Sequence, residues 1–321
     1  MRIIFMGTPE FAVPSLRRLC EEGYAPVAVA TGPDRERGRG QQMQPTPVKE
    51  AALELGVERI LQPEAVRAEA FAEEVAALEP DVIAVAAYKI LPPAVFTPAA
   101  KGAFNLHSSL LPKYRGAAPI HRAVMDGAQQ TGVTTFFLEE RVDTGDVILQ
   151  RTTPIGPDET AGAVHDRLKE IGAEAVVETV RRIEDGTAEA TPQDDAEATP
   201  APKLRAEDGE VPWSLDAQTV HDHIRGLSPW PGAWTKHDGT RLKLYRSHLP
   251  EDAAALPGGD APGTVLEAKS GADGRLVVAC GDGAVELVEL QQPGKTVLPA
   301  ADFLNGYALD VGDRLGRTAD D

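Results

Sequence analysis

The chain has 321 residues, only two cysteines (Cys20 and Cys280) and a formal net charge of −18 at pH 7. The distant cysteines exclude a disulfide framework and a cysteine-rich zinc site. The charge excludes wholesale attraction to nucleic acid, so an RNA partner would have to be met by local basic patches. The length predicts two domains, and the absence of a signal peptide or a run of about 20 apolar residues predicts a cytoplasmic protein.

Short apolar strands alternate with segments of helical spacing through the first third of the chain. We expect strands at residues 3–6, 26–31, 59–61, 81–87 and 102–106. This alternation predicts an α/β fold with a Rossmann-like, doubly wound and mostly parallel sheet. Two further strands at 133–139 and 147–153 are predicted to pair, and a long helix follows at 160–183.

Residues 184–202 change in character, because they are acidic, hold three prolines and lack large apolar side chains. This composition predicts a linker. After a helix near 217–227, short strands alternate with turn pairs such as Asp238-Gly239 and Asp282-Gly283. The pattern predicts a small β-barrel, similar to an OB fold, over residues 203–321.

Two polar side chains stand together at the end of the strand near residue 105. Asn105 and His107 are two positions apart, so they point to the same face of the strand. Open α/β sheets bind ligands at the ends of their strands, which makes the pair a candidate site. Without other signals, a turn-capping Asn105 and a core His107 explain the residues equally well.

Two loops carry further candidates. Ser109, Leu110, Leu111 and Pro112 follow the strand directly and could cradle a flat aromatic ligand. Asp143 and Asp146 bring two carboxylates into a turn between the paired strands. An ordinary connecting loop and an ordinary hairpin turn would use the same residue types.

The order and spacing of three motifs carry a family resemblance. M-G-T-P-E-F-A opens the chain, N-L-H-S-S-L-L-P-K-Y-R-G-A-A-P begins at Asn105, and D-T-G-D begins at Asp143. Residues 1–183 resemble the folate-dependent formyltransferases. Gly38-Arg39-Gly40 and the run from Ser228 to Ala233 are similar to features of the members of that family that act on tRNA.

The resemblance implies an activity and a set of roles. It makes Asn105, His107 and Asp143 the catalytic residues and assigns Ser109 to Pro112 to the folate site. The implied donor is 10-formyltetrahydrofolate, and the implied acceptor is the α-amino group of initiator methionyl-tRNA. We expect no metal and a monomer. Residues 1–183 would be the catalytic domain, 184–202 an acidic linker and 203–321 a tRNA-binding domain.

Two basic patches are candidates for tRNA contact. The first is a polar, glycine-rich loop at 34–45 with Arg37 and Arg39, in which tRNA-acting relatives carry lysines where this chain has Gln41 and Gln42. Fewer cations should weaken the salt dependence of binding. The second is a hairpin at 234–246, whose alternation puts Arg241, Lys243 and Tyr245 on one face. Lys203 and Arg205 would extend it. A solvated loop and a solvated barrel face remain the plain alternatives.

Other activities fit the sequence less well. Formyltransferases that act on nucleotide-linked amino sugars share the three residues and can carry a small second domain. A formyl-folate hydrolase or a purine-pathway enzyme would not account for the C-terminal barrel. A dinucleotide binder is disfavoured because Gly7-Thr8-Pro9 is not the glycine-rich fingerprint. A noncatalytic RNA-binding module would leave the three site residues unexplained.

Overall fold

The computed structural model describes residues 1–37, 42–252, 260–271 and 274–316. Contacts divide the chain into two compact units. The N-terminal unit holds Met1–Pro119, Thr131–Thr153 and His165–Pro202, and the C-terminal unit holds Ile120–Gln130, Pro154–Val164 and Lys203–Asp321. Two segments inside the predicted first domain therefore belong to the C-terminal unit. The reason is local packing: for example, Arg122 in the first of them lies 3.0 Å from Asp208.

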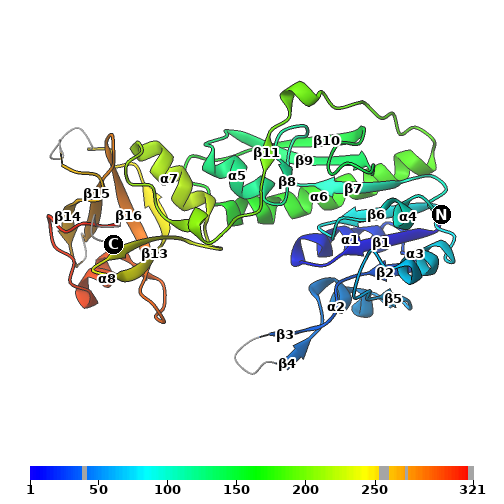
Figure 1. Ribbon diagram of the computed structural model, residues 1–321, viewed down its shortest axis with the longest axis horizontal. Coiled ribbons are helices and arrows are strands. Elements are labelled where there is room, and N and C mark those ends of the chain that lie inside the picture. Colours follow the sequence, from blue (N-terminus) through cyan, green and yellow to red (C-terminus); the bar gives the residue numbers. More distant parts are fainter. Residues whose placement is uncertain (38–41, 253–259, 272–273, 317–321) are drawn as a thin grey trace. The chain divides into compact units, whose positions relative to one another are not determined.

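A seven-stranded sheet forms the centre of the N-terminal unit (Figure 1). Strands β1, β2, β5, β6 and β7 pair in parallel, whereas β9 runs antiparallel to β7. With β1 inside the sheet and the chain winding out to both sides, the predicted doubly wound α/β fold is confirmed. In sheet order the strands are β10 Val147–Pro154, β9 Gln130–Phe137, β7 Ala103–His107, β6 Val82–Ala86, β1 Ile3–Gly7, β2 Ala28–Ala30 and β5 Ile60–Leu61.

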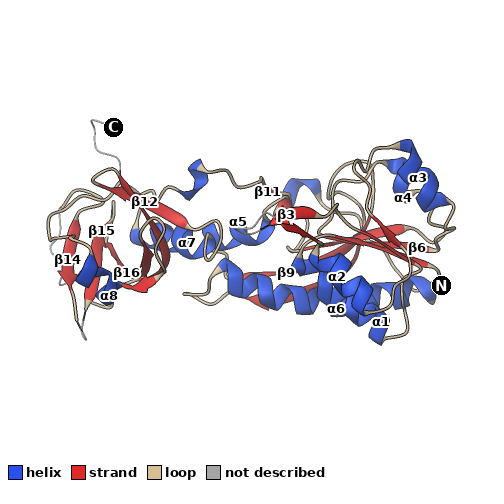
Figure 2. Cartoon of the chain, turned by 90° about the horizontal axis from the view of Figure 1, so that it is seen from below, coloured by secondary structure: helices blue, strands red, loops and turns tan. Residues whose placement is uncertain are grey.

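Helices cover both faces of this sheet. Figure 2 shows α1 (Val13–Glu21), α2 (Pro47–Glu54) and α6 (Ala161–Glu184) on one face and α3 (Glu69–Ala76) and α4 (Pro93–Phe96) on the other. Apolar side chains at alternate strand positions pack against α3 and α4 in one buried cluster. The sheet is thereby dry on both sides, as a parallel sheet requires.

The predicted arginine loop contains a short ribbon. β3 (Arg35–Arg37) and β4 (Gln42–Gln44) pair antiparallel, with Glu36 opposite Met43 (Figure 1). The antiparallel pairing satisfies backbone hydrogen bonds within the ribbon, whichever side chains it carries. Arg39 and Gln41 lie outside the described residues.

The C-terminal unit is built on an antiparallel sheet with the order β12-β13-β16-β15-β14, beside helix α7 (Ala217–Gly226). The predicted hairpin turn is present, because Asp238 and Gly239 have φ values of 47° and 74°. The other elements are α5 Pro119–Met125, β12 Ala233–His237, β13 Thr240–His248, β14 Val265–Lys269, β15 Arg275–Ala279, β16 Ala284–Gln291, β17 Leu298–Pro299 and α8 Ala300–Gly306.

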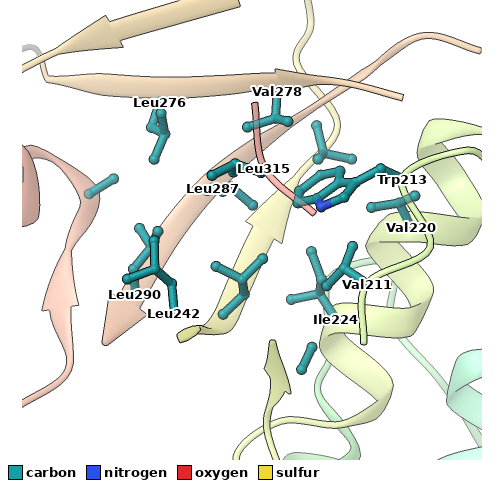
Figure 3. Close-up of a cluster of buried hydrophobic side chains, with 14 of the residues drawn as sticks. Val211, Trp213, Val220, Ile224, Leu242, Leu276, Val278, Leu287, Leu290 and Leu315 are labelled. Carbon is teal, nitrogen blue, oxygen red and sulfur yellow. The ribbon is translucent and has the colours of Figure 1, made fainter. Parts of the chain in front are cut away.

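Residues 309–316 join the two outer strands of this sheet. Leu315 N donates to Gly263 O at 2.8 Å beside β14, and Gly316 N donates to Lys236 O of β12 at 2.9 Å. The sheet therefore closes into the predicted barrel. Its core brings Trp213, Ile224 and Leu315 against strand residues (Figure 3), and Trp213 Nε1 donates to Thr235 Oγ1 at 2.9 Å.

One half-buried histidine gives this unit a pH dependence. Burial lowers the pKa of His223 in α7 from 6.5 to about 4, and Nε2 finds no hydrogen-bond partner among the described residues. Because the unfolded chain binds the proton first, the stabilisation is complete above pH ~6.5 and is lost as the pH falls toward 4. At about 1.36 kcal/mol per pKa unit, the loss is roughly 3 kcal/mol.

Urea unfolding at pH 7 and pH 4 measures this loss, because the fluorescence of the three tryptophans, all within residues 203–321, reports on the C-terminal unit. Wild type is expected to lose roughly 3 kcal/mol more than His223→Gln. His165→Gln, at a more exposed histidine, should behave as wild type. Equal losses in wild type and His223→Gln would contradict the assignment.

Candidate active site

Strand β7 carries two of the predicted site residues. Asn105 lies between Val85 of β6 and Phe136 of β9, and His107 lies opposite Thr134 of β9. The strand is fixed on both sides, so its side chains have little freedom to move with the backbone. Asn105 is half-buried and His107 is 6% exposed.

A hydrogen bond of the His107 ring defines its tautomer. Nε2 lies 2.9 Å from the carbonyl oxygen of Tyr114. A carbonyl only accepts, so Nε2 carries the hydrogen and Nδ1 keeps a lone pair in the neutral ring. Nδ1 lies 3.8 Å from Oδ2 of Asp143, and both side chains are nearly buried. The ring is therefore arranged to take a proton at Nδ1 beside a carboxylate.

Asp143 is held in an uncommon conformation. Its φ is 58°, in the left-handed region that Asp tolerates better than most side chains. Oδ2 accepts a hydrogen bond from Gly116 N at 2.9 Å. Such backbone persists only when the surrounding structure holds it, and it is common at functional sites.

Asn105 and Asp143 line one small cavity of about 90 Å³ in the N-terminal unit. His107 is not part of its wall, and its Nδ1 lies 3.8 Å from Oδ2 of Asp143. The rest of the wall comes mainly from the segments after β6 and β9, and it consists of Val85, Tyr88, Lys89, Ile90, Leu91, Phe96, Leu138, Glu139, Glu140, Arg141 and Val142. None of these residues was predicted as a site residue, although the apolar pair Ile90-Leu91 shortly after β6 was a signal.

The predicted folate loop lies apart from this cavity wall. Ser109 is fully buried, its Oγ donates to Lys113 O at 2.6 Å, and its carbonyl accepts from Thr134 Oγ1 at 2.7 Å. Leu111 N donates to the same hydroxyl at 3.1 Å. These bonds fix the path of the chain between His107 and Tyr114. A direct folate contact by residues 109–112 stays a prediction.

Of the predicted tRNA residues in the C-terminal unit, two lie exposed before the barrel and two belong to its first hairpin. Lys203 is exposed, and Arg205, whose side chain is 77% exposed, lies 3.8 Å from Glu207. On the hairpin, the guanidinium of Arg241 stacks 3.8 Å over the Trp234 ring, and Lys243 Nζ donates to Pro231 O at 3.0 Å. The inward residues Leu242 and Leu244 are fully buried, so the predicted alternation is present.

Other classes of site and location can be checked on the same residues. Across the described parts of the chain, His, Cys, Asp and Glu side chains nowhere gather in threes that could hold a metal ion. Of the helices within residues 1–37, 42–252, 260–271 and 274–316, none has the length and apolar character needed to cross a membrane. Arg37 belongs to β3, and Arg39 lies beyond what the structure describes.

Comparison with known proteins defines the class. Residues 1–180 match the family model described as formyl transferase, and residues 203–308 match the formyl transferase C-terminal domain. The chain is thus a transferase with both parts of the formyl transferase architecture.

The chain is 50% identical over 315 residues to methionyl-tRNA formyltransferase of Chlorobium luteolum, covering 97% of this chain and 98% of that protein. It is 46% identical over 318 residues to the protein of the same name from Citrifermentans bemidjiense, covering 99% and 97%. The chain belongs to the methionyl-tRNA formyltransferase family.

Solved structures share the fold at lower identity. WlaRD, described as a sugar 3N-formyl transferase, matches with a TM-score of 0.66 and 16% identity over 92% of this chain and 99% of its own. HypX from Aquifex aeolicus, described in complex with tetrahydrofolic acid, matches with a TM-score of 0.63 and 24% identity over 99% of this chain and 51% of its own. At these identities the likeness shows the fold alone.

Proposed function

We propose that this protein transfers the formyl group of 10-formyltetrahydrofolate to the α-amino group of initiator methionyl-tRNA, and so supports translation initiation. The observation that carries the proposal is the buried pair of His107 Nδ1 and Asp143 Oδ2, 3.8 Å apart, beside the cavity that Asn105 lines. Family membership supplies the identity of the substrates. The proposal places the reaction in the cytoplasm and takes the monomer as the working unit.

His107 acts as the general base. An α-amino group has a pKa of ~7.7 to 8.0, so a large fraction is protonated at neutral pH and must lose a proton before it attacks. Nδ1 of His107 takes this proton, directly or through a water, while Nε2 stays bound to Tyr114 O at 2.9 Å. Asp143 stabilises the imidazolium that forms, as a buried carboxylate does for other catalytic histidines.

Asn105 stabilises the charge that develops on the formyl oxygen. As the amine nitrogen bonds to the formyl carbon, that oxygen becomes an oxyanion, and the Asn105 amide can donate a hydrogen bond to it. The bond between the formyl carbon and the folate nitrogen then breaks. His107 returns its proton to the leaving nitrogen, and the attacking nitrogen loses its second proton to water. Each turnover therefore yields the formylated amine, tetrahydrofolate and one released proton.

The cavity at Asn105 is the proposed entry point for the folate ring. Its wall combines apolar side chains, including Leu91, Phe96 and Leu138, with the catalytic Asn105 and Asp143. Apolar side chains make up about half of the wall, and apolar surface combined with placed polar groups is typical of sites for small ring compounds. We propose that the folate ring enters here and that residues 109–112 support the adjoining strand end.

We propose that local groups of Lys and Arg side chains bind the tRNA. With a net charge of −18, the chain needs them to attract RNA. The candidates are Lys203, Arg205, Arg241 and Lys243, together with Arg37 of β3 and with Arg39, which lies outside the described residues. Exposure of Lys203 and Arg205 supports a role for these two.

The acceptor is tested by offering formyl-folate together with initiator methionyl-tRNA, elongator methionyl-tRNA or a nucleotide-linked amino sugar in parallel. We expect formylation of the initiator tRNA, measured by release of tetrahydrofolate and by mass of the acceptor. Formylation of the sugar but not of the initiator would replace the proposed acceptor with the amino-sugar alternative.

Tyr88 provides a test of the donor cavity. Burial raises its pKa to about 12, so the hydroxyl is protonated and can donate, yet it has no hydrogen-bond partner among the described residues. Tyr88→Phe should stabilise the ligand-free protein by up to roughly 1 kcal/mol, since a buried unpaired group is removed. The same change should raise the KM for formyl-folate about tenfold, because a hydrogen bond to the ligand is worth about 1.4 kcal/mol. Thermal unfolding and steady-state rates measure the two effects. An unchanged KM for the donor would separate Tyr88 from its binding.

A further inference from the structure

The segment 191–201 contacts the backbone of Asp143 and of Tyr114, the residue that binds the His107 ring, although its composition is that of a linker. At one end, Thr191 and Val147 exchange backbone hydrogen bonds of 2.8 and 2.9 Å, just beyond the D-T-G-D turn. At the other end, β11 (Pro200–Ala201) pairs in parallel with β8 (Arg115–Gly116). The segment thus spans from the turn that carries Asp143 to the strand whose Gly116 N binds the Asp143 carboxylate.

Gln193 joins these two pieces through one side-chain amide. Its Nε2 donates to the carbonyl oxygens of Asp143 at 3.0 Å and Gly145 at 2.8 Å. Its Oε1 accepts from Arg115 Nε at 3.1 Å and Nη2 at 2.8 Å. Both N–H groups and the oxygen of the amide are used, and only a side chain with donors and an acceptor at the same end can make all these bonds.

The same segment also holds Tyr114, the residue that binds the His107 ring. Tyr114, whose carbonyl accepts from His107 Nε2, has its own N–H bound to Thr199 Oγ1 at 2.8 Å. Arg115 N donates to Thr199 O at 2.8 Å, and Arg115 Nη1 lies 2.7 Å from Asp195 Oδ1. The backbone that fixes His107 and the backbone that fixes Asp143 are therefore anchored on one segment.

We propose that the 191–201 segment is a positioning element of the active site and that Gln193 sets the separation of His107 and Asp143. The inference rests on the proposed function, since it assigns Gln193 a role through Asp143. Asp143 has a φ of 58°, and the two carbonyls bound by Gln193 lie at this residue and two residues beyond it. Without them the strained turn relaxes and the carboxylate moves away from Nδ1. A displacement of about 1 Å can cost about 10²-fold in rate.

The test compares Gln193→Ala and Gln193→Glu with the wild type. The carboxylate introduced by Gln193→Glu keeps an acceptor for Arg115 but has no N–H for the two carbonyls, so this variant isolates the donor function. Both variants are expected to lower kcat about 10- to 100-fold and to leave the KM of both substrates within about threefold. Glu189→Gln, at an exposed position just before the segment, is the matched control and should keep the wild-type rate.

A double-mutant cycle distinguishes positioning from general damage to the fold. If Gln193 acts through Asp143, adding Gln193→Ala to Asp143→Asn should lower kcat by less than about threefold beyond Asp143→Asn alone. A full additional loss would overturn the route through Asp143, and an unchanged kcat in both single variants would overturn the proposal itself. Should Gln193→Ala not fold, Gln193→Glu takes its place in the cycle. A wild-type protein that formylates no acceptor would instead refute the proposed function.

Discussion

Replacing His107 with glutamine is expected to lower kcat by about 10²- to 10⁴-fold, the usual contribution of a general base. The glutamine amide can still donate to Tyr114 O, which His107 Nε2 meets at 2.9 Å, so the loop keeps its anchor. It cannot accept a proton at the position of Nδ1. The KM values should change little, because the ring does not line the cavity that contains Asn105. Single-turnover formylation of initiator methionyl-tRNA measures the effect directly.

His165→Gln is the control for this experiment. His165 lies in the same unit, and its side chain is 38% exposed beside Asp166. The control should retain wild-type turnover. A His107→Gln protein that is folded and within about threefold of the wild-type kcat would show that another group removes the proton.

The second large effect concerns charge on the formyl oxygen. Asn105→Ala is expected to lower kcat by about 10²- to 10³-fold, the typical cost of removing one oxyanion donor. Since the donor acts mainly on the transition state, kcat and kcat/KM should fall together. Stability should change little, because Asn105 is half-buried and lines a cavity instead of filling the core.

The chain offers a matched control for Asn105, because it contains only one other asparagine, Asn305. Asn305 is exposed in α8, and Asn305→Ala should be indistinguishable from wild type in rate. Steady-state kinetics with both substrates varied separates kcat from KM. If Asn105→Ala raised only the KM of the donor, the amide would be a binding group and the oxyanion would need another donor.

Local patterns were sufficient to predict much of the fold and the neighbourhood of Asn105 and His107. Because side chains alternate along a strand, two residues spaced by two share a face. β7 carries both Asn105 and His107. The same rule on the barrel hairpin put Arg241 and Lys243 on one face, and the alternate residues Leu242 and Leu244 are buried. The position of Asp143 came from a motif, because a turn with Asp and Gly has no local feature that distinguishes it from other turns.

Other features could not be predicted, because they depend on contacts between distant parts of the chain. Gln193 meets residues 48 to 78 positions away, and no periodic pattern encodes such bonds. Its acidic, proline-rich surroundings are typical of a linker. The assignment of residues 120–130 and 154–164 to the C-terminal unit likewise depends on packing between separate segments. The cavity wall was missed because it is assembled from two loops that follow different strands.

The strap at residues 309–316 has a consequence for how the protein can be shortened. The C-terminal family match ends at residue 308, so a chain trimmed to that limit would look complete by sequence comparison. It would nevertheless lose the hydrogen bonds that Leu315 and Gly316 make to Gly263 and Lys236 at opposite margins of the sheet. Edge strands with unpaired backbone N–H and C=O groups can pair with strands of other chains. We therefore expect the trimmed protein to self-associate. Residues 309–316 thus protect the sheet from aggregation in addition to completing the barrel.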